Sequence, residues 1–152
     1  MIEFDTYIQK IDMEKWVAYA IISMLFAGLT SVIAKFGLKH VSGDTGLAVR
    51  TVVVFLLVWS NALIGQGINQ FRALDRSSVI FLAISGVTTS LSWIFYYRAI
   101  KLGPVSQVAM IDKGSIVIAL VLSVWILKEP ITLKTMGGAM LILLGLVVIA
   151  WK

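Results

Sequence analysis

The sequence contains no cysteine and only one histidine, His40. The absence of cysteine excludes disulfides, thiolate nucleophiles and thiolate metal sites, and one histidine cannot build a histidine-rich centre within a single chain. A nucleophile grouped with a base and an orienting residue, and a glycine loop for phosphate, are also missing from the pattern. The sequence therefore predicts neither an enzyme nor a bound cofactor.

Charge is scarce as well. Only 14% of the residues are charged, 59% are hydrophobic, and the mean hydropathy is +0.96. Soluble domains carry about 25% charged residues, so a water-soluble fold is not expected. The net charge is +5, but the basic residues stand at the ends of apolar runs and form no single patch. This arrangement predicts contact with membrane lipid and not with nucleic acid.

Apolar runs fill almost the whole sequence. A hydrocarbon core about 30 Å thick needs about 20 apolar residues per helix, and five stretches meet that length. They are residues 16–38, 47–65, 77–100, 105–127 and 133–151. The predicted fold is an all-α integral membrane protein with five transmembrane helices, in the inner membrane of a cell.

Residues 1–15 are less apolar than the rest of the sequence and carry both acidic and basic side chains. Phe4, Tyr7, Ile8 and Ile11 recur at helical spacing within a segment of mixed charge. Such a pattern is typical of a helix that lies on the membrane surface. We therefore expect an interfacial segment over residues 1–15 and the transmembrane domain over residues 16–152.

An odd number of spans places the two termini on opposite sides of the membrane. The basic residues near the ends of the spans then divide evenly between the two faces. Positive charge normally marks the cytoplasmic side, so this sequence specifies its orientation poorly. Either the charge count is too crude a predictor, or the chain inserts both ways, as an antiparallel homodimer requires.

Four motifs, in order along the chain, resemble those of one transporter family. They are residues 28–38 (GLTSVIAKFGL), 93–106 (WIFYYRAIKLGPVS), 108–115 (VAMIDKGS) and 127–130 (LKEP). Together they are similar to EamA-type members of the drug/metabolite transporter superfamily. Met110 stands where many such relatives carry proline, so a helix break near Asp112 is left open.

The resemblance implies a transporter in which two five-helix halves of opposite orientation enclose the substrate. Inverted repeats of this kind bind substrate between the halves, near the membrane midplane. The sequence corresponds to one half, so the resemblance implies that two antiparallel copies pair. Gly137, Gly138 and Gly145 in the last span allow close helix contact and are our candidates for that dimer.

Charges inside hydrocarbon are costly, so Asp112 and Lys113 in the fourth span need partners. Adjacent helical residues point about 100° apart, and we therefore expect these two to pair with other helices and not with each other. Arg50 is the expected partner of Asp112, with Lys35 next. The interaction is either a salt bridge that tightens the bundle or part of a site for substrate or a proton.

The third span carries further candidates. Ser85, Thr89, Ser92 and Tyr96 share one helical face, which either lines a polar path or packs closely against another helix. Trp93 and Tyr97 either hold an organic cation or belong to an interfacial aromatic belt. Asn61 shares a face with Arg50 in the second span. The predicted substrate-binding residues are Asp112, Lys113, Arg50, Trp93, Tyr96, Ser92, Thr89, Asn61 and Lys35.

The sequence thus predicts half of a secondary transporter that works as a homodimer and moves a small polar or amphiphilic metabolite. If transport is active, Asp112 is the group available for coupling to a proton or another ion. Two other readings stay open: a non-transporting accessory subunit of another membrane protein, and a flippase for a lipid carrier.

Overall fold

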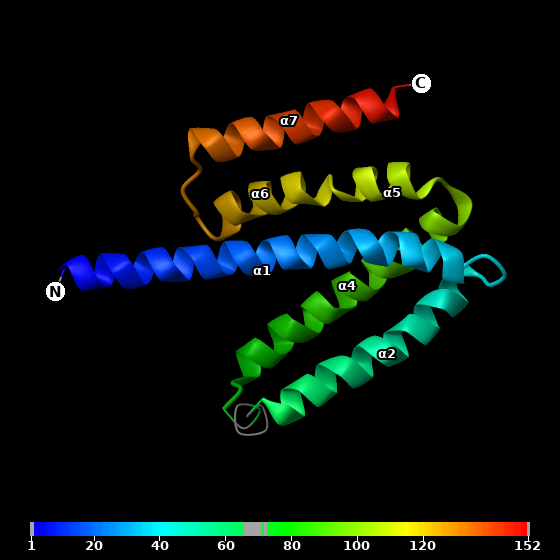
Figure 1. Cartoon of the computed structure of the whole chain (residues 1–152), viewed down its shortest axis with the longest axis horizontal. Coiled ribbons are helices and arrows are strands. Elements are labelled where there is room, and N and C mark those ends of the chain that lie inside the picture. Colours follow the sequence, from blue (N-terminus) through cyan, green and yellow to red (C-terminus); the bar gives the residue numbers. More distant parts are fainter. Residues whose placement is uncertain (1, 66–70, 72, 152) are drawn as a thin grey trace.

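The computed structural model describes residues 2–65, 71 and 73–151, and these residues form helices without any strand. The helices are α1 (Ile2–Gly37), α2 (Gly43–Ile64), α4 (Arg76–Leu102), α5 (Val105–Asp112), α6 (Ser115–Ile126) and α7 (Leu133–Ala150) (Figure 1). The predicted all-α fold class is confirmed. The interfacial segment expected over residues 1–15 stays a prediction, because α1 runs continuously from Ile2 into the first span without a boundary at residue 15.

Four helical segments in the described part of the chain are long and apolar enough to cross a membrane. They are Lys15–Gly37, Gly43–Ile64, Arg76–Leu102 and Val105–Ile126, the last made of α5 and α6 together. Leu133–Ile149 within α7 is apolar but shorter. At 1.5 Å per residue it still reaches about 26 Å, close to the hydrocarbon thickness. The five-helix count therefore fits, and the chain is a multi-pass membrane protein.

Short polar caps explain where the helices begin. Ser42 Oγ accepts a hydrogen bond from the Thr45 N–H at 3.1 Å at the start of α2. Asp75 accepts from the N–H groups of Ser77 and Ser78 at the start of α4. These side chains satisfy backbone donors that have no partner within the helix. The caps therefore fix the first residues of α2 and α4.

The side-chain core is small and lies at one end of the helical assembly. Leu38, Leu47, Tyr97 and Ile100 form the buried apolar cluster, where α1 and α4 end and α2 begins. In Figure 1, α2 and α4 diverge from α1 with distance from this end. Most large apolar side chains of the spans are exposed on the single chain. In a membrane protein such side chains face lipid or another subunit.

Two lysines tie the ends of α1 and α4 together. Lys35 Nζ donates to the carbonyls of Ile100 at 2.6 Å and Gly103 at 3.0 Å. Lys101 Nζ donates in return to the carbonyls of Leu38 at 2.6 Å and Lys39 at 3.2 Å. Each ammonium thus binds the last carbonyls of the other helix, where the helix dipole is negative.

The fourth span is broken at Lys113–Gly114, between α5 and α6. The Lys113 N–H bonds to the Met110 carbonyl at 3.1 Å, and the Gly114 N–H to the Ile111 carbonyl at 2.9 Å. Bonds three residues apart make a tighter turn than an α-helix does. The break that the sequence left open is therefore present, and it forms without a proline at Met110.

Candidate functional site

A polar pocket of about 190 Å³ lies between α1, α2, α4 and the end of α5. It gathers six of the nine residues that the sequence predicts for the site. Its lining residues are Ala27, Thr30, Ser31, Arg50, Ser92, Trp93, Tyr96, Tyr97, Asp112 and Lys113.

The pocket lies between one and two helical turns along the spans from their ends. The short turns after α1 and after α4 place the ends of these helices, and the starts of α2 and α5, at one membrane face. Ser31, Arg50, Tyr97 and Asp112 each lie between one and two turns from that face, which corresponds to about 10 Å of helix. Polar groups at this depth are rare and usually functional.

Arg50 is the central cation of the pocket. Its guanidinium carbon lies 4.3 Å from the ring centroid of Trp93 and 5.6 Å from that of Tyr97. Both distances are within the range of a cation–π interaction. Among the described residues, no carboxylate lies within ion-pair distance of Arg50. The predicted Arg50–Asp112 ion pair is therefore not present.

Asp112 pairs with its neighbour instead. Lys113 Nζ lies 4.0 Å from Asp112 Oδ2. The expectation that these two residues cannot meet is wrong, because it considered only the directions in which adjacent side chains leave the helix. The four-carbon stem of lysine is flexible, and it brings the Lys113 ammonium group back to the neighbouring carboxylate. The side chains remain accessible, with exposed fractions of 39% for Asp112 and 56% for Lys113.

A hydroxyl pair joins α1 to α4 beside the arginine. Ser31 Oγ and the Tyr96 hydroxyl oxygen lie 2.7 Å apart, and Ser31 Oγ also donates to the Ala27 carbonyl at 3.1 Å. Since a serine has one hydroxyl hydrogen, Tyr96 donates to Ser31. The pair fixes Tyr96 at the pocket wall.

Three predicted residues lie outside the polar pocket. Thr89 is exposed on α4, and Asn61 is exposed near the far end of α2. Lys35 is held by the carbonyls at the end of α4, as described above. Their roles in substrate binding stay predictions.

Sequence reasoning missed the two hydroxyl residues that α1 contributes to the pocket. Thr30 and Ser31 line it, and Ser31 is buried. Hydroxyl residues are enriched where membrane helices contact each other, and two adjacent ones in an apolar span were the signal that could have found them.

An apolar pocket of about 480 Å³ adjoins the polar one. The two share Thr30, Arg50 and Tyr97. The other lining residues of the apolar pocket are Ile33, Ala34, Gly37, Leu38, Val41, Thr45, Gly46 and Val49. Arg50 therefore stands at the border between a polar and an apolar compartment.

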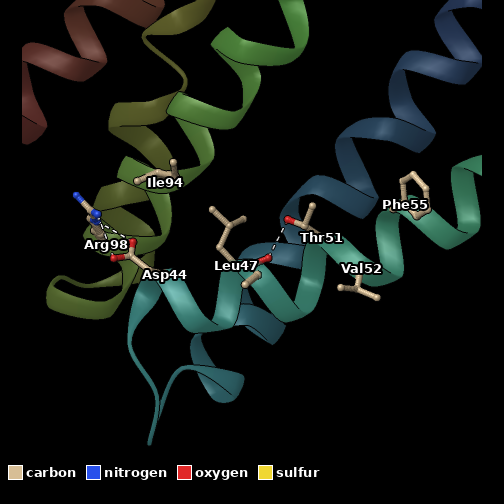
Figure 2. A pocket seen from close by; sticks show the side chains of 8 residues that line it. Asp44, Leu47, Thr51, Val52, Phe55, Ile94 and Arg98 are labelled. Atoms are coloured by element: carbon tan, nitrogen blue, oxygen red, sulfur yellow. Dashed lines mark hydrogen bonds and ion pairs between the residues drawn. The ribbon is translucent and has the colours of Figure 1, made fainter. Parts of the chain in front are cut away.

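A separate pocket of about 590 Å³ lies between α2 and α4 (Figure 2). Leu47, Val52, Phe55 and Ile94 give it an apolar wall, and an ion pair stands at one end. There Arg98 Nε and Nη2 donate to Asp44 Oδ1 at 2.8 Å and Oδ2 at 3.0 Å. Two nitrogens of Arg98 thus bind a carboxylate, whereas no described carboxylate lies within ion-pair distance of Arg50.

Among the described residues, no group of three histidine, aspartate or glutamate side chains could hold a metal ion. The ionisable groups of the polar pocket, two cations and one carboxylate, suit the binding of a charged organic molecule.

Comparison with known proteins gives two matches. Residues 14–151 match the model of the EamA-like transporter family. A Sinorhizobium protein named as an uncharacterized transporter in the cobO 3′ region is 34% identical over 140 residues. That alignment covers 90% of this chain and 97% of the relative. No solved structure matches the chain.

Proposed function

Since the chain belongs to the EamA-like transporter family, we propose that it is one half of a secondary transporter that works as a homodimer. The two copies enclose a pathway centred on the polar pocket. The cargo is a small polar or amphiphilic metabolite, and Asp112 is the group that couples transport to a proton.

The accessibility of Asp112 and Lys113 carries this proposal. Both side chains are more than one third exposed on the single chain, at a depth where lipid would surround them. A charge that faces hydrocarbon is costly, whereas a charge that faces a water-filled cavity is tolerated. A second copy placed over the pocket would remove these charges from lipid and would complete such a cavity.

The relative supports a transporter built from a unit of this size. The alignment covers 97% of the Sinorhizobium protein, so nearly all of that protein aligns with this chain. On α7, a Cβ added at Gly137, Gly138 or Gly145 would meet no atom within 4 Å. These positions are therefore open to a second chain, and we propose that α7 contributes to the dimer.

Antiparallel pairing can be tested by labelling. A cysteine introduced at His40, which is exposed after α1, would be the only thiol in the chain. A membrane-impermeant maleimide should label half of the copies from each side of native vesicles. Labelling from one side only would rule out the antiparallel homodimer.

The role of Asp112 can be tested in proteoliposomes that contain the purified protein. A panel of radiolabelled metabolites and an internal pH indicator report cargo flux and proton flux together. Asp112→Asn should abolish both fluxes. Asp44→Asn is the matched control, because Asp44 is a carboxylate in a span that pairs with Arg98 outside the polar pocket.

Full activity of Asp112→Asn would remove Asp112 from the mechanism. Absence of flux with every cargo, by a correctly folded protein, would favour an accessory subunit instead. Flux of a fluorescent short-chain lipid, without flux of any water-soluble cargo, would favour a lipid-carrier flippase.

A further inference from the structure

We infer that the polar pocket recognises an organic monocarboxylate with a compact apolar body. The carboxylate binds Arg50, and the apolar body occupies the adjoining apolar pocket. The inference that this ligand is the cargo rests on the proposed transport function, but the binding itself does not.

The first argument is the free hydrogen-bonding edge of Arg50. The guanidinium carbon lies 4.3 Å from the centroid of the Trp93 ring, and this cation–π contact involves no hydrogen-bond acceptor for the five N–H donors of the group. No described residue accepts a hydrogen bond from them or pairs with them as an anion. Arg98 shows what the same group does with a carboxylate in reach, because two of its nitrogens bind Asp44. Arg50 offers the same fork to a ligand.

The second argument is the charge of the pocket. Arg50 and Lys113 are cations, and Asp112 is the single carboxylate among the lining residues. The pocket therefore carries one net positive charge, which one carboxylate on the ligand would neutralise. A dianion would overcompensate it, and a cation would add to it in a medium of low dielectric constant.

The same geometry argues against an organic cation. The faces of Trp93 and Tyr97 could hold such a ligand, as the sequence suggested. Arg50 already lies over both rings, at 4.3 Å and 5.6 Å from their centroids. A ligand cation would have to displace this guanidinium or lie beside it. The aromatic wall therefore orients Arg50 and does not form an empty cation cage.

The third argument is the position of Arg50 between two pockets. The apolar pocket of about 480 Å³ is within the range of about 300–1,000 Å³ that is common for small-molecule sites. The polar pocket alone, at about 190 Å³, is below it. A ligand that bridges them places its charged end at Arg50 and its apolar end near Ile33, Ala34 and Val49.

Equilibrium binding of radiolabelled phenylacetate to the purified protein in detergent tests this inference. Phenylacetamide and 2-phenylethylammonium serve as competitors of nearly the same size without the negative charge. We expect phenylacetate to bind at least tenfold more tightly than either. Equal competition by the amide, tighter binding of the ammonium ion, or no phenylacetate binding would each overturn the inference.

Variants locate the two ends of the ligand. Arg50→Gln should weaken phenylacetate binding at least tenfold, and Arg50→Lys should weaken it less. Arg98→Gln, the matched control outside both pockets, should leave the affinity unchanged. Val49→Trp should fill the apolar pocket and weaken phenylacetate while preserving the preference for acid over amide. Unchanged affinity in Arg50→Gln would overturn the inference. If that variant does not fold, Arg50→Lys and the three ligands on the wild-type protein decide the question.

Flux in proteoliposomes separates this inference from the proposed function. Phenylacetate that binds through Arg50 without being transported would leave the ligand class standing and would count against transport. Transport of an organic cation, by a protein that does not bind phenylacetate, would support the proposed transport function and would overturn the inferred ligand class.

Discussion

Replacing Lys35 by methionine should loosen the junction between α1 and α4. The substitution keeps the length and the apolar stem of the side chain and removes the ammonium group. Lys35 Nζ donates to Ile100 O at 2.6 Å, Gly103 O at 3.0 Å and Lys101 O at 3.4 Å. All three acceptors are carbonyls at the end of α4, where the helix provides no donor for them.

The magnitude follows from these contacts. A hydrogen bond from a charged group contributes about 1.5–3 kcal/mol, and the interaction of a cation with a helix C-terminus adds about 0.3–1 kcal/mol. Only the 2.6 Å bond is short, and the three carbonyls share one ammonium group. The expected loss in the free energy of unfolding is therefore about 2–4 kcal/mol.

Equilibrium unfolding in mixed micelles of increasing SDS content, followed by far-UV circular dichroism, measures this loss. Lys39→Met is the matched control, because Lys39 is a nearby lysine with an exposed side chain. It should change the free energy of unfolding by less than about 0.5 kcal/mol, as surface substitutions do. Equal effects of the two substitutions would refute the reasoning.

Lys101→Met extends the experiment, because Lys101 makes the reciprocal tie to the carbonyls of Leu38 and Lys39. Groups at one junction usually couple by 0.5–3 kcal/mol in a double-mutant cycle, whereas separate sites add independently. Strict additivity with Lys35→Met would show that the two lysines do not stabilise a common junction.

The same unfolding assay checks three further predictions. Gly43→Ala should destabilise the protein by about 1–3 kcal/mol, because the new Cβ would lie 3.0 Å from backbone atoms of Tyr97 and Arg98, and an unchanged stability would contradict this contact. Lys128→Gly should stabilise it by about 0.5–1 kcal/mol, because Lys128 has a φ of 55°, which glycine adopts without strain. Tyr96→Phe should cost about 1 kcal/mol through loss of the 2.7 Å bond to Ser31, and combining it with Ser31→Ala should cost less than the two single losses added together.

The number and placement of the spans could be predicted because the membrane imposes a length. A run of about 20 apolar residues has few alternatives to a spanning helix. In the structure Ser42, Asp75 and Thr132 cap helices that begin within a few residues of the predicted runs. The break at Gly114 could not be predicted in this way, because run length and capping residues describe only the ends of a span. In the structure Gly114 packs closely against α7, since a Cβ there would lie 3.2 Å from Leu146 Cδ1.

The site was harder to predict than the spans. Offsets along one helix show that Ser92 and Tyr96 share a face, and both do line the polar pocket. The same arithmetic grouped Thr89 with them, although Thr89 lies beyond the pocket. Which helix a face meets depends on the register between helices, and no offset within one helix contains that information. This is why Lys35 could be named as a candidate partner of Asp112, but not as a hydrogen-bond donor to the α4 carbonyls.

The ion pairs of the described residues also determine the electrostatics of the pocket. The single carboxylate among the lining residues, Asp112, lies 4.0 Å from the ammonium group of Lys113. Arg50 is left on the face of Trp93 without an anion among the described residues. The pairing of Asp112 with Lys113 thus leaves Arg50 without a counter-ion at the border of the two pockets, and the carboxylate of a ligand would neutralise it.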